Sequence, residues 1–361
     1  MRFPYILFLL IVFIFSRIPF LDLGFSSFES PTDQDVLAMV NSAYLLHYSH
    51  IYAVSRFPGS PVYEIINSFL IEGGWLATNS ATMIISLMTV ILFGKILKIF
   101  DIKNRTLLLV TFMFIPVIWI NSTITMDYMW GLAFILLAFY LTFRGKYNYS
   151  GIALAFAAGI RITSLVMLIP LVYWMLQKKT GSKRICSFLL TSILFSIIYF
   201  SPVLYTYGLE FLKYYPRIIT FNEVYYGFTT QLLSIPALSL LLISLVIARD
   251  IPQKDPVFNV SLIVLFIYAL LFILHPSKPA YLIPAVPFGM IALSKSFPRL
   301  TVIMVCVLVI LNGIISIGIQ NNEEKFNIGY GSVIKNFEER KKSVPQSTQY
   351  LESLSEALQK G

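Results

Sequence analysis

Residues 185–204 read I-C-S-F-L-L-T-S-I-L-F-S-I-I-Y-F-S-P-V-L, a run of 20 residues without a charge. An α-helix needs about 20 mostly apolar residues to cross the hydrocarbon core of a bilayer. The run has that length and composition, so it predicts a transmembrane helix.

The composition of the whole chain points the same way. Of its 361 residues, 57% are hydrophobic and 12% are charged, whereas soluble domains carry about 25% charged residues. So little polar surface could not be solvated as a globule in water. The sequence therefore predicts an all-α, polytopic bundle of transmembrane helices.

Eleven apolar segments are predicted to be membrane spans. They lie at 4–21, 78–98, 106–122, 127–143, 148–160, 162–177, 185–204, 230–248, 257–274, 281–294 and 300–319. The segments at 148–160 and 281–294 are short enough to be part-depth helices. No signal-peptide cleavage site follows the first segment, which is therefore expected to stay as an uncleaved span.

The basic residues between the segments predict the orientation. Cytoplasmic loops of membrane proteins carry an excess of Lys and Arg. With the N-terminus in the cytoplasm, 15 of the 27 Lys and Arg residues fall in inside segments, and six fall in outside segments before the tail. The multi-pass chain is expected in the plasma membrane of a prokaryote or the endoplasmic reticulum of a eukaryote, with its C-terminus outside. Because topology accounts for the charges, a nucleic-acid partner is not expected.

This topology divides the chain into two parts. A transmembrane domain covers 1–319, with large outside loops at 22–77 and 205–229, and a polar tail at 320–361 is predicted to form a short outside surface helix. Cys186 and Cys306 lie in apolar runs without C-x-x-C spacing, so neither a disulfide framework nor a zinc site is indicated.

The first outside loop predicts a helix that lies on the membrane surface. Thr32 to Asp35 opens it, and its apolar residues recur at helical spacing: Val36, Val40, Ala43 and Tyr44. One apolar stripe with a polar opposite face is typical of an interfacial helix. The P-G-S-P turn at 58–61 follows Arg56 and sets a rigid bend before a second short helix.

Asp33 and Asp35 stand at the start of this surface helix and have two interpretations. Acids suit a helix N-terminus, and Thr32 with Asp35 three residues later resembles a capping box. Alternatively, one carboxylate is a general base or metal ligand that faces a membrane-embedded substrate. Residue chemistry alone favours capping.

Ionisable residues at the predicted outer membrane face are candidates for substrate binding, because charges beside hydrocarbon are costly. The cations are Arg56, Arg161, His275 and Lys278. An arginine can grip a phosphate group with two parallel hydrogen bonds. The alternative is that these side chains only snorkel to the lipid headgroups. Glu64 and Asp127 are expected to line the same cavity, although polar capping also explains each.

Three passages together form a further pattern. The first is D-Q-D at 33–35 followed by S-R-F-P-G-S-P-V-Y-E at 55–64, the second is the Gly- and Ala-rich stretch at 151–171 that turns at Arg161, and the third is H-P-S-K-P-A-Y-L-I-P-A-V-P-F at 275–288. With the topology, these passages resemble the GT-C superfamily of polyprenyl-phosphate-sugar-dependent glycosyltransferases, which includes protein O-mannosyltransferase and lipid A aminoarabinose transferase types.

The resemblance implies an inverting transfer of a sugar from a dolichyl- or undecaprenyl-phosphate carrier to a protein, lipid or glycan acceptor outside the membrane. A first-loop acid would be the general base, which shifts the interpretation of Asp33 and Asp35 towards catalysis without deciding between them. Asp127 matches a second acid at the outside end of an early helix. The late passage places Tyr281 at the substrate. Ala280 stands there in place of the relatives' Arg, so Lys278 is expected to supply the positive charge.

Two other functions stay open at this point. One is a transporter or flippase of lipid-linked saccharides, which predicts repeat symmetry and mid-span charges that the sequence does not show. The other is a polymerase or ligase of surface polysaccharide. A divalent metal, Mg²⁺ or Mn²⁺, also stays open as a cofactor.

Overall fold

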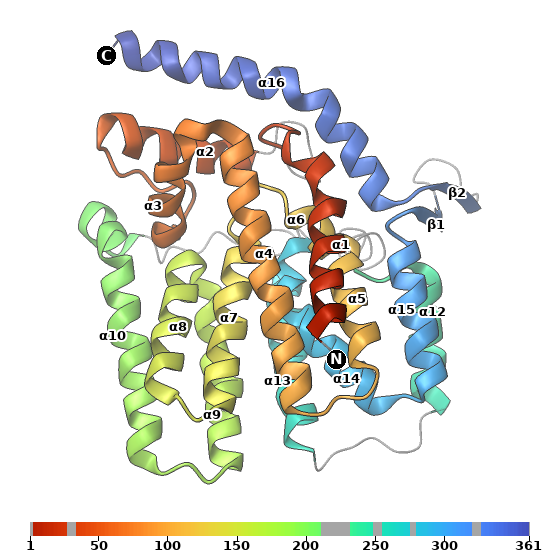
Figure 1. The fold of residues 1–361 in the computed structure, drawn as a ribbon. Helices are drawn as coiled ribbons and strands as arrows, with labels where there is room; N and C mark the ends of the chain where they lie inside the picture. The colour runs from red at the N-terminus through yellow and green to blue at the C-terminus, as the bar shows by residue number, and fades with distance from the viewer. Residues whose placement is uncertain are drawn as a thin grey trace. The chain divides into compact units, whose positions relative to one another are not determined.

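The computed structural model describes residues 3–26, 34–210, 232–247, 255–274, 279–319 and 326–360. Most of these residues are helical (Figure 1), which confirms the all-α class. They belong to two compact units. Unit 1 comprises Met1–Leu9, Val90–Ile120 and Arg217–Asn336, and unit 2 comprises Leu10–Thr89, Asn121–Pro216 and Phe337–Gly361.

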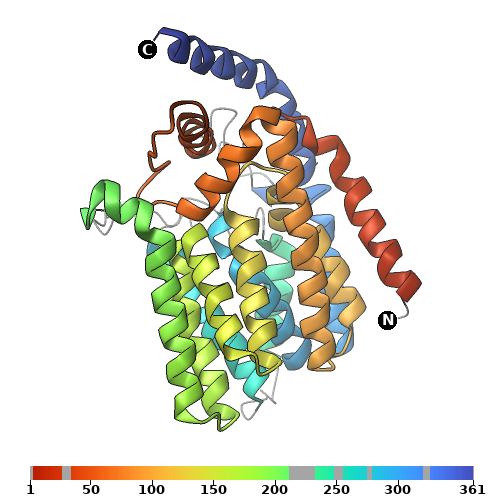
Figure 2. The ribbon, with the colours of Figure 1, turned by 60° about the vertical axis from the view of Figure 1, so that its left-hand side comes forward.

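Unit 2 contains the first-loop helices and a helical bundle. Its elements are most of α1 (Phe3–Leu21), α2 (Gln34–Ser49), α3 (Pro61–Leu70), the 3₁₀ turn η1 (Ile71–Gly73), the first part of α4 (Gly74–Ile99), α7 (Tyr128–Phe143), α8 (Tyr147–Ile160), η2 (Ile162–Met167), α9 (Leu168–Gln177), α10 (Ser182–Tyr207) and most of α16 (Ser332–Lys360). Figures 1 and 2 both show α2 beside α3.

Unit 1 contains the remaining helices and a small sheet. Its elements are the second part of α4, α5 (Arg105–Phe114), α6 (Pro116–Asn121), α12 (Ile235–Ile247), α13 (Pro256–Leu274), η5 (Pro279–Ala285), α14 (Val286–Ser296), α15 (Arg299–Leu311), β1 (Ile315–Ile319) and β2 (Phe326–Tyr330).

Three helical segments are long and apolar enough to cross a membrane, namely Pro61–Ile99, Ser182–Tyr207 and Pro256–Leu274. Shorter apolar helices lie in other predicted spans, for example Tyr128–Phe143 and Arg299–Leu311. Length and composition therefore support a membrane protein. The count of eleven spans and the orientation stay predictions.

The predicted span at 106–122 is two helices. Ile115 adopts an extended conformation with ψ of 131° between α5 and α6, and Pro116 begins α6. A proline pushes the residue before it out of the helical region, so the apolar run is interrupted although its hydropathy is continuous.

The predicted span at 300–319 is wrong in its last third. Helix α15 ends at Leu311, and residues 315–319 form β1, which pairs antiparallel with β2. Large apolar residues alternate along both strands, and the register sets Ile315 opposite Tyr330 and Ile317 opposite Ile328. Such an alternation is typical of a strand and not of a helix. The alternation was hidden in the sequence because Ser316 and Gly318, the residues between the isoleucines, do not interrupt the high hydropathy of the run.

Small residues let the helices of unit 2 approach closely. Gly151 on α8 lies against α10, where an added Cβ would come within 2.9 Å of the Phe188 carbonyl oxygen. The hydroxyl of Ser150 donates a 2.7 Å hydrogen bond to the Ala138 carbonyl of α7. Close backbone contact and interhelical hydrogen bonds are the main sources of helix association where burial of apolar surface cannot contribute.

Replacing Gly151 by alanine is predicted to lower thermal stability. The new methyl group would force α8 away from α10, and overpacking of this kind costs about 1–3 kcal/mol. Melting of the detergent-purified protein would show the shift. Gly181→Ala is the matched control, because nothing lies within 4 Å of an added Cβ there. Equal melting temperatures for both variants would contradict the packing account.

Candidate functional site

A buried carboxylate lies at the N-terminus of α7. The side chain of Asp127 is 1% exposed. Its Oδ1 accepts a 2.7 Å hydrogen bond from Arg161 Nη1, and its Oδ2 accepts hydrogen bonds from Arg56 Nη2 at 3.2 Å and Ser60 Oγ at 3.1 Å. A buried charge is tolerated when it is paired and hydrogen-bonded in this way.

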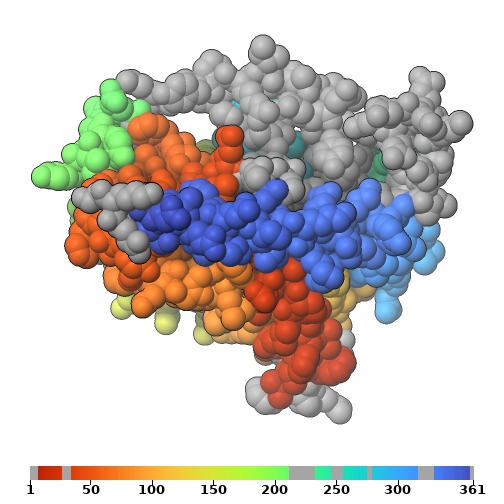
Figure 3. Space-filling view, turned by 90° about the horizontal axis from the view of Figure 1, so that it is seen from above, coloured from red at the N-terminus to blue at the C-terminus, as the bar shows by residue number. Residues whose placement is uncertain are grey.

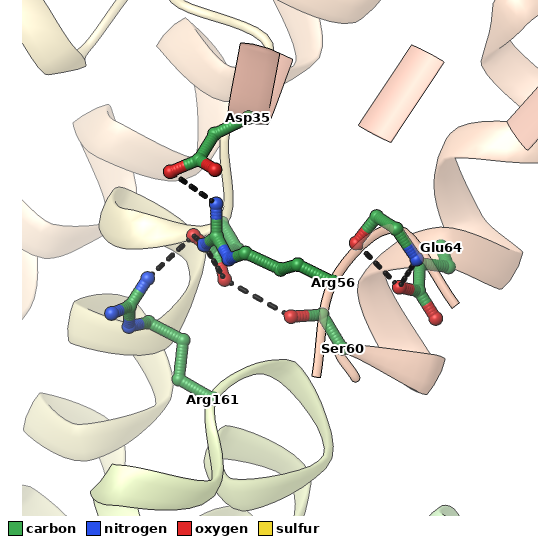
Figure 4. Close-up of polar contacts among 7 residues, drawn as sticks. Asp35, Arg56, Ser60, Glu64 and Arg161 are labelled. Carbon is green, nitrogen blue, oxygen red and sulfur yellow. Dashed lines mark hydrogen bonds and ion pairs between the residues drawn. The ribbon is translucent and has the colours of Figure 1, made fainter. Parts of the chain in front are cut away.

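Arg56 connects this buried carboxylate to a more accessible one. Its Nη2 binds Asp127, and its Nη1 lies 3.1 Å from Asp35 Oδ2. The side chain of Asp35 is 29% exposed, against 1% for Asp127. Figure 4 shows Asp35 paired with the guanidinium group of Arg56, while Arg161 approaches the cluster from a different element. We call Asp35, Arg56, Asp127 and Arg161 the acid–arginine cluster. It joins two carboxylates and two guanidinium groups.

The conformation at the end of α8 aims Arg161 at the cluster. Arg161 leaves the helix in an extended conformation, with φ of −146° and ψ of 111°. Its guanidinium lies over the ring of Tyr128 at 4.5 Å, and its aliphatic part passes close to Gly131, where an added Cβ would lie 3.3 Å from Cδ. Cation–π contact and the pair with Asp127 therefore hold the arginine in one orientation.

Glu64 fixes the loop that carries Arg56. The Glu64 side chain is fully buried. It accepts hydrogen bonds from the Tyr52 hydroxyl at 2.7 Å, the Ser55 amide at 2.8 Å and the Ser55 hydroxyl at 2.7 Å. Burial and the negative charge of Glu64 raise the pKa of Tyr52 above its ordinary value, so Tyr52 remains a hydrogen-bond donor.

A tight turn completes this loop. The Gly59 amide donates to the Arg56 carbonyl at 2.7 Å, and Gly59 has φ of +95°. This conformation strongly favours glycine. An added Cβ would also lie 3.0 Å from a methyl group of Val203. Arg56 and Ser60 flank this turn, and both donate to Asp127 Oδ2.

Polar side chains of α4 support the irregular segment that precedes Asp127. The hydroxyls of Thr78 and Thr125 are 2.6 Å apart, and Thr125 also donates to Asn79 Oδ1 at 2.9 Å. The Trp130 indole nitrogen donates to Thr82 at 3.2 Å. All of these groups are buried. Buried polar side chains need hydrogen-bond partners, and these contacts hold the segment and the start of α7 against α4.

Arg340 of the tail helix holds the same segment from the opposite end of the chain. Its guanidinium is fully buried and donates to the Thr123 hydroxyl at 3.1 Å, the Thr123 carbonyl at 2.8 Å and the Phe20 carbonyl at 3.1 Å. Burial lowers the pKa of Arg340 to about 9. The Phe20 carbonyl is at the C-terminus of α1, where a helix favours a cation.

The tail also contacts the helix that carries Asp35. The Tyr350 hydroxyl donates to the Leu37 carbonyl of α2 at 3.2 Å, and the Ser347 hydroxyl accepts from the Phe25 amide at 2.9 Å. Figure 3 shows α16 lying along the first-loop residues. The predicted short surface helix is therefore a 29-residue helix, and its unit 2 part packs on α1 and α2 of the same unit through buried polar groups.

The structure brings together four of the residues proposed from the sequence, which form the acid–arginine cluster. The carboxylate of Asp35 pairs with Arg56, and the residue also lies in the first turn of α2, where an acid is favourable. Glu64 lies on the same loop, and Tyr281 is a half-buried residue of η5 in unit 1. Asp33, His275 and Lys278 lie outside the described residues.

Sequence reasoning missed several residues that build the site. Ser60 lies in the P-G-S-P turn that the sequence identified, but nothing there indicated a contact with Asp127. Tyr52 and Ser55 gave no pattern of their own. Arg340 is a single basic residue among several in a polar helix, so it carried no signal for burial.

Comparisons with known proteins identify no relative: no family model, no curated protein and no solved structure matches the chain. Within the described residues, no group of three or more His, Cys, Asp or Glu side chains could hold a metal ion. The function is therefore argued from the site itself.

Asp127 and Arg161 are predicted to be energetically coupled. Asp127→Asn leaves two arginines around a neutral amide, and breaking a buried ion pair by removing one partner costs about 3–5 kcal/mol. Arg161→Gln has a similar effect. The double variant should lose less stability than the sum of the single variants, as thermal unfolding in detergent would show. Strictly additive losses would mean that the two side chains do not interact.

Arg340→Met is predicted to loosen the tail helix. The variant keeps much of the side-chain volume but removes the hydrogen bonds to Thr123 and Phe20. Limited proteolysis should cut within 341–360 faster than in the wild type, with a lower melting temperature. Lys341→Met, at an exposed neighbouring position, should behave as the wild type. Equal cleavage of the two variants would show that Arg340 does not anchor α16.

Proposed function

We propose that the chain is a membrane glycosyltransferase that transfers a sugar from a polyprenyl-phosphate carrier to an acceptor outside the membrane, with inversion at the sugar. The observation that supports it most is the arrangement of Asp35: a partly exposed carboxylate in the first turn of α2, held by Arg56 above a buried Asp127–Arg161 pair. The GT-C resemblance expects an acid at this position.

Asp35 is assigned as the general base because the two cluster carboxylates differ in environment. Asp127 is buried and receives hydrogen bonds from Arg161, Arg56 and Ser60, so its charge serves to position the arginines. Asp35 is accessible at 29% of its side-chain surface, which allows an acceptor hydroxyl to approach. Asp33 remains the alternative base.

In the proposed reaction, the acceptor oxygen attacks C1 of the sugar while the bond from C1 to the carrier phosphate oxygen breaks. The electron pair of that bond leaves with the polyprenyl phosphate, and the acceptor proton passes to the carboxylate of Asp35. A single displacement of this kind inverts the configuration at C1. A base positioned for such a transfer contributes about 10²–10⁴ in rate.

The leaving phosphate requires positive charge at the outer edge of the bundle. Arg56 and Arg161 are each paired with a carboxylate, so the cluster is formally neutral. An additional cation would therefore have to face the phosphate, and Lys278 of the late passage is proposed for this role. In this account Arg56 and Arg161 align the acid and orient the phosphate, since a guanidinium can bind two acceptors at once.

Asp35→Asn is predicted to reduce transfer by about 10²-fold or more, because the amide cannot accept the acceptor proton. The purified protein would be incubated with a set of radiolabelled polyprenyl-phosphate sugars and acceptors, and released carrier and labelled product would be measured. Asp33→Asn is assayed in parallel. Glu72→Gln, an exposed acid in the same predicted outside loop, is the control and should keep wild-type turnover.

Three outcomes would count against the proposal. If the wild type consumes no donor, the glycosyltransferase assignment fails. If a variant with both Asp33→Asn and Asp35→Asn keeps full turnover, the base assignment fails. If the labelled donor crosses the bilayer of a reconstituted vesicle without cleavage of the sugar–phosphate bond, a flippase is the better description.

A further inference from the structure

A polar cavity lies in unit 1, and none of the residues of the acid–arginine cluster lines it. It has a volume of about 1250 Å³ and is formed by the α4–α5 loop, the α14–α15 junction and the residue before α13. Its charged lining residues are Asp101, Lys103, Arg105, Asp255, Lys295 and Arg299. Four cations and two acids give this cavity a positive balance.

Ion pairs with acids of the cavity neutralise only part of its positive charge. Lys295 Nζ lies 2.5 Å from Asp255 Oδ2. Burial would raise the pKa of Asp255, but the hydrogen bond from Lys295 contributes to a net value below the ordinary one, which keeps this pair ionised. Arg105 contacts Asp101 at 3.5 Å, and that acid is 94% exposed.

Two further cations of the lining have no acidic partner within the described ranges. In the part of the chain that the structure describes, no acid pairs with Lys103 or Arg299. The loop that carries Lys103 is held in place, because the Ser294 hydroxyl donates to its carbonyl at 2.8 Å. Two cations of one concave site that have no acidic partner among the described residues are suited to an anion.

An apolar cavity adjoins the polar one. It has a volume of about 420 Å³ and lies among α5, α12, α13, α14 and α15. Phe297 lines both cavities. Helix α13, which contributes Leu262 and Leu265 to the wall, is one of the helices long enough to cross a membrane. Together the two cavities offer a cationic opening and an adjacent apolar space between helices.

We propose that this pair of cavities binds one anionic phospholipid. Lys103 and Arg299 hold its phosphate, and one acyl chain enters the apolar cavity past Phe297. Basic pockets between membrane helices bind anionic lipid headgroups by these means. Basic loops alone are explained by topology, but topology does not require a cavity or an apolar extension of it. The inference relies on the membrane location of the chain and not on the proposed glycosyl transfer.

Retention of lipid by the full-length purified protein tests the proposal directly. Delipidated protein in detergent is titrated with dioleoyl phosphatidylglycerol or dioleoyl phosphatidylcholine, and bound lipid is counted by native mass spectrometry. The wild type should prefer the glycerol lipid. A variant with Lys103→Gln and Arg299→Gln should bind it about tenfold or more weakly, because each basic side chain near an anionic headgroup contributes about 1 kcal/mol.

A matched control removes two charges elsewhere. Lys183→Gln with Arg184→Gln neutralises two exposed residues at the start of α10, on the same predicted side of the membrane, and should leave retention unchanged. Leu293→Trp, which adds bulk to the wall of the apolar cavity, should weaken binding of the dioleoyl lipid more than binding of a short-chain phosphatidylglycerol.

The proposal is overturned by any of four results. Equal retention of the two lipids by the wild type would exclude charge selection. Equal loss in both double variants would point to general surface charge. Complete displacement of the lipid by inorganic phosphate at the same concentration would show that the apolar cavity does not contribute to binding. Preferential binding of a polyprenyl phosphate would show that the site binds a different lipid. Melting curves of every variant confirm that each is folded, and no sugar donor or turnover enters the readout.

Discussion

The carboxylate of Asp127 is the group on which the arrangement of unit 2 depends. It is removed from solvent and receives hydrogen bonds from Arg161, Arg56 and Ser60. An ionised group in such a place is tolerated only when its partners are held in position, because removal of one partner leaves an unpaired buried charge. The first-loop turn, the end of α8 and the start of α7 must therefore meet at one point.

The elements around this point are shaped by that requirement. Gly59 allows the turn that presents Arg56, and Gly131 leaves space for the side chain of Arg161. The segment before Asp127 is irregular, and its backbone and hydroxyl groups are satisfied by α4 and by Arg340 of α16. The accessible carboxylate of Asp35 is the last group in this series of contacts. Its position therefore depends on the buried groups that hold Arg56.

Hydropathy and charge in the sequence were sufficient for the helical class and for the four charged residues of the acid–arginine cluster, because unpaired charges beside apolar runs are costly wherever they occur. The pairing itself was not predictable. Asp127 is 34 positions from Arg161 and 71 from Arg56, and no local spacing connects such residues. Arg340 is 217 positions from Thr123. The strand at 315–319 was missed because β-branched residues raise hydropathy in a strand as they do in a membrane helix.

A structure of the full chain in a lipid nanodisc with a polyprenyl-phosphate sugar bound tests the central claim most directly. The account predicts that C1 of the sugar lies beside the acid–arginine cluster. An acceptor oxygen about 3–3.5 Å from C1, ready to attack, would then be within hydrogen-bond distance of the Asp35 carboxylate. The account also predicts that Asp127 keeps its contacts with Arg56 and Arg161. A donor bound with its phosphate distant from this cluster would contradict the account.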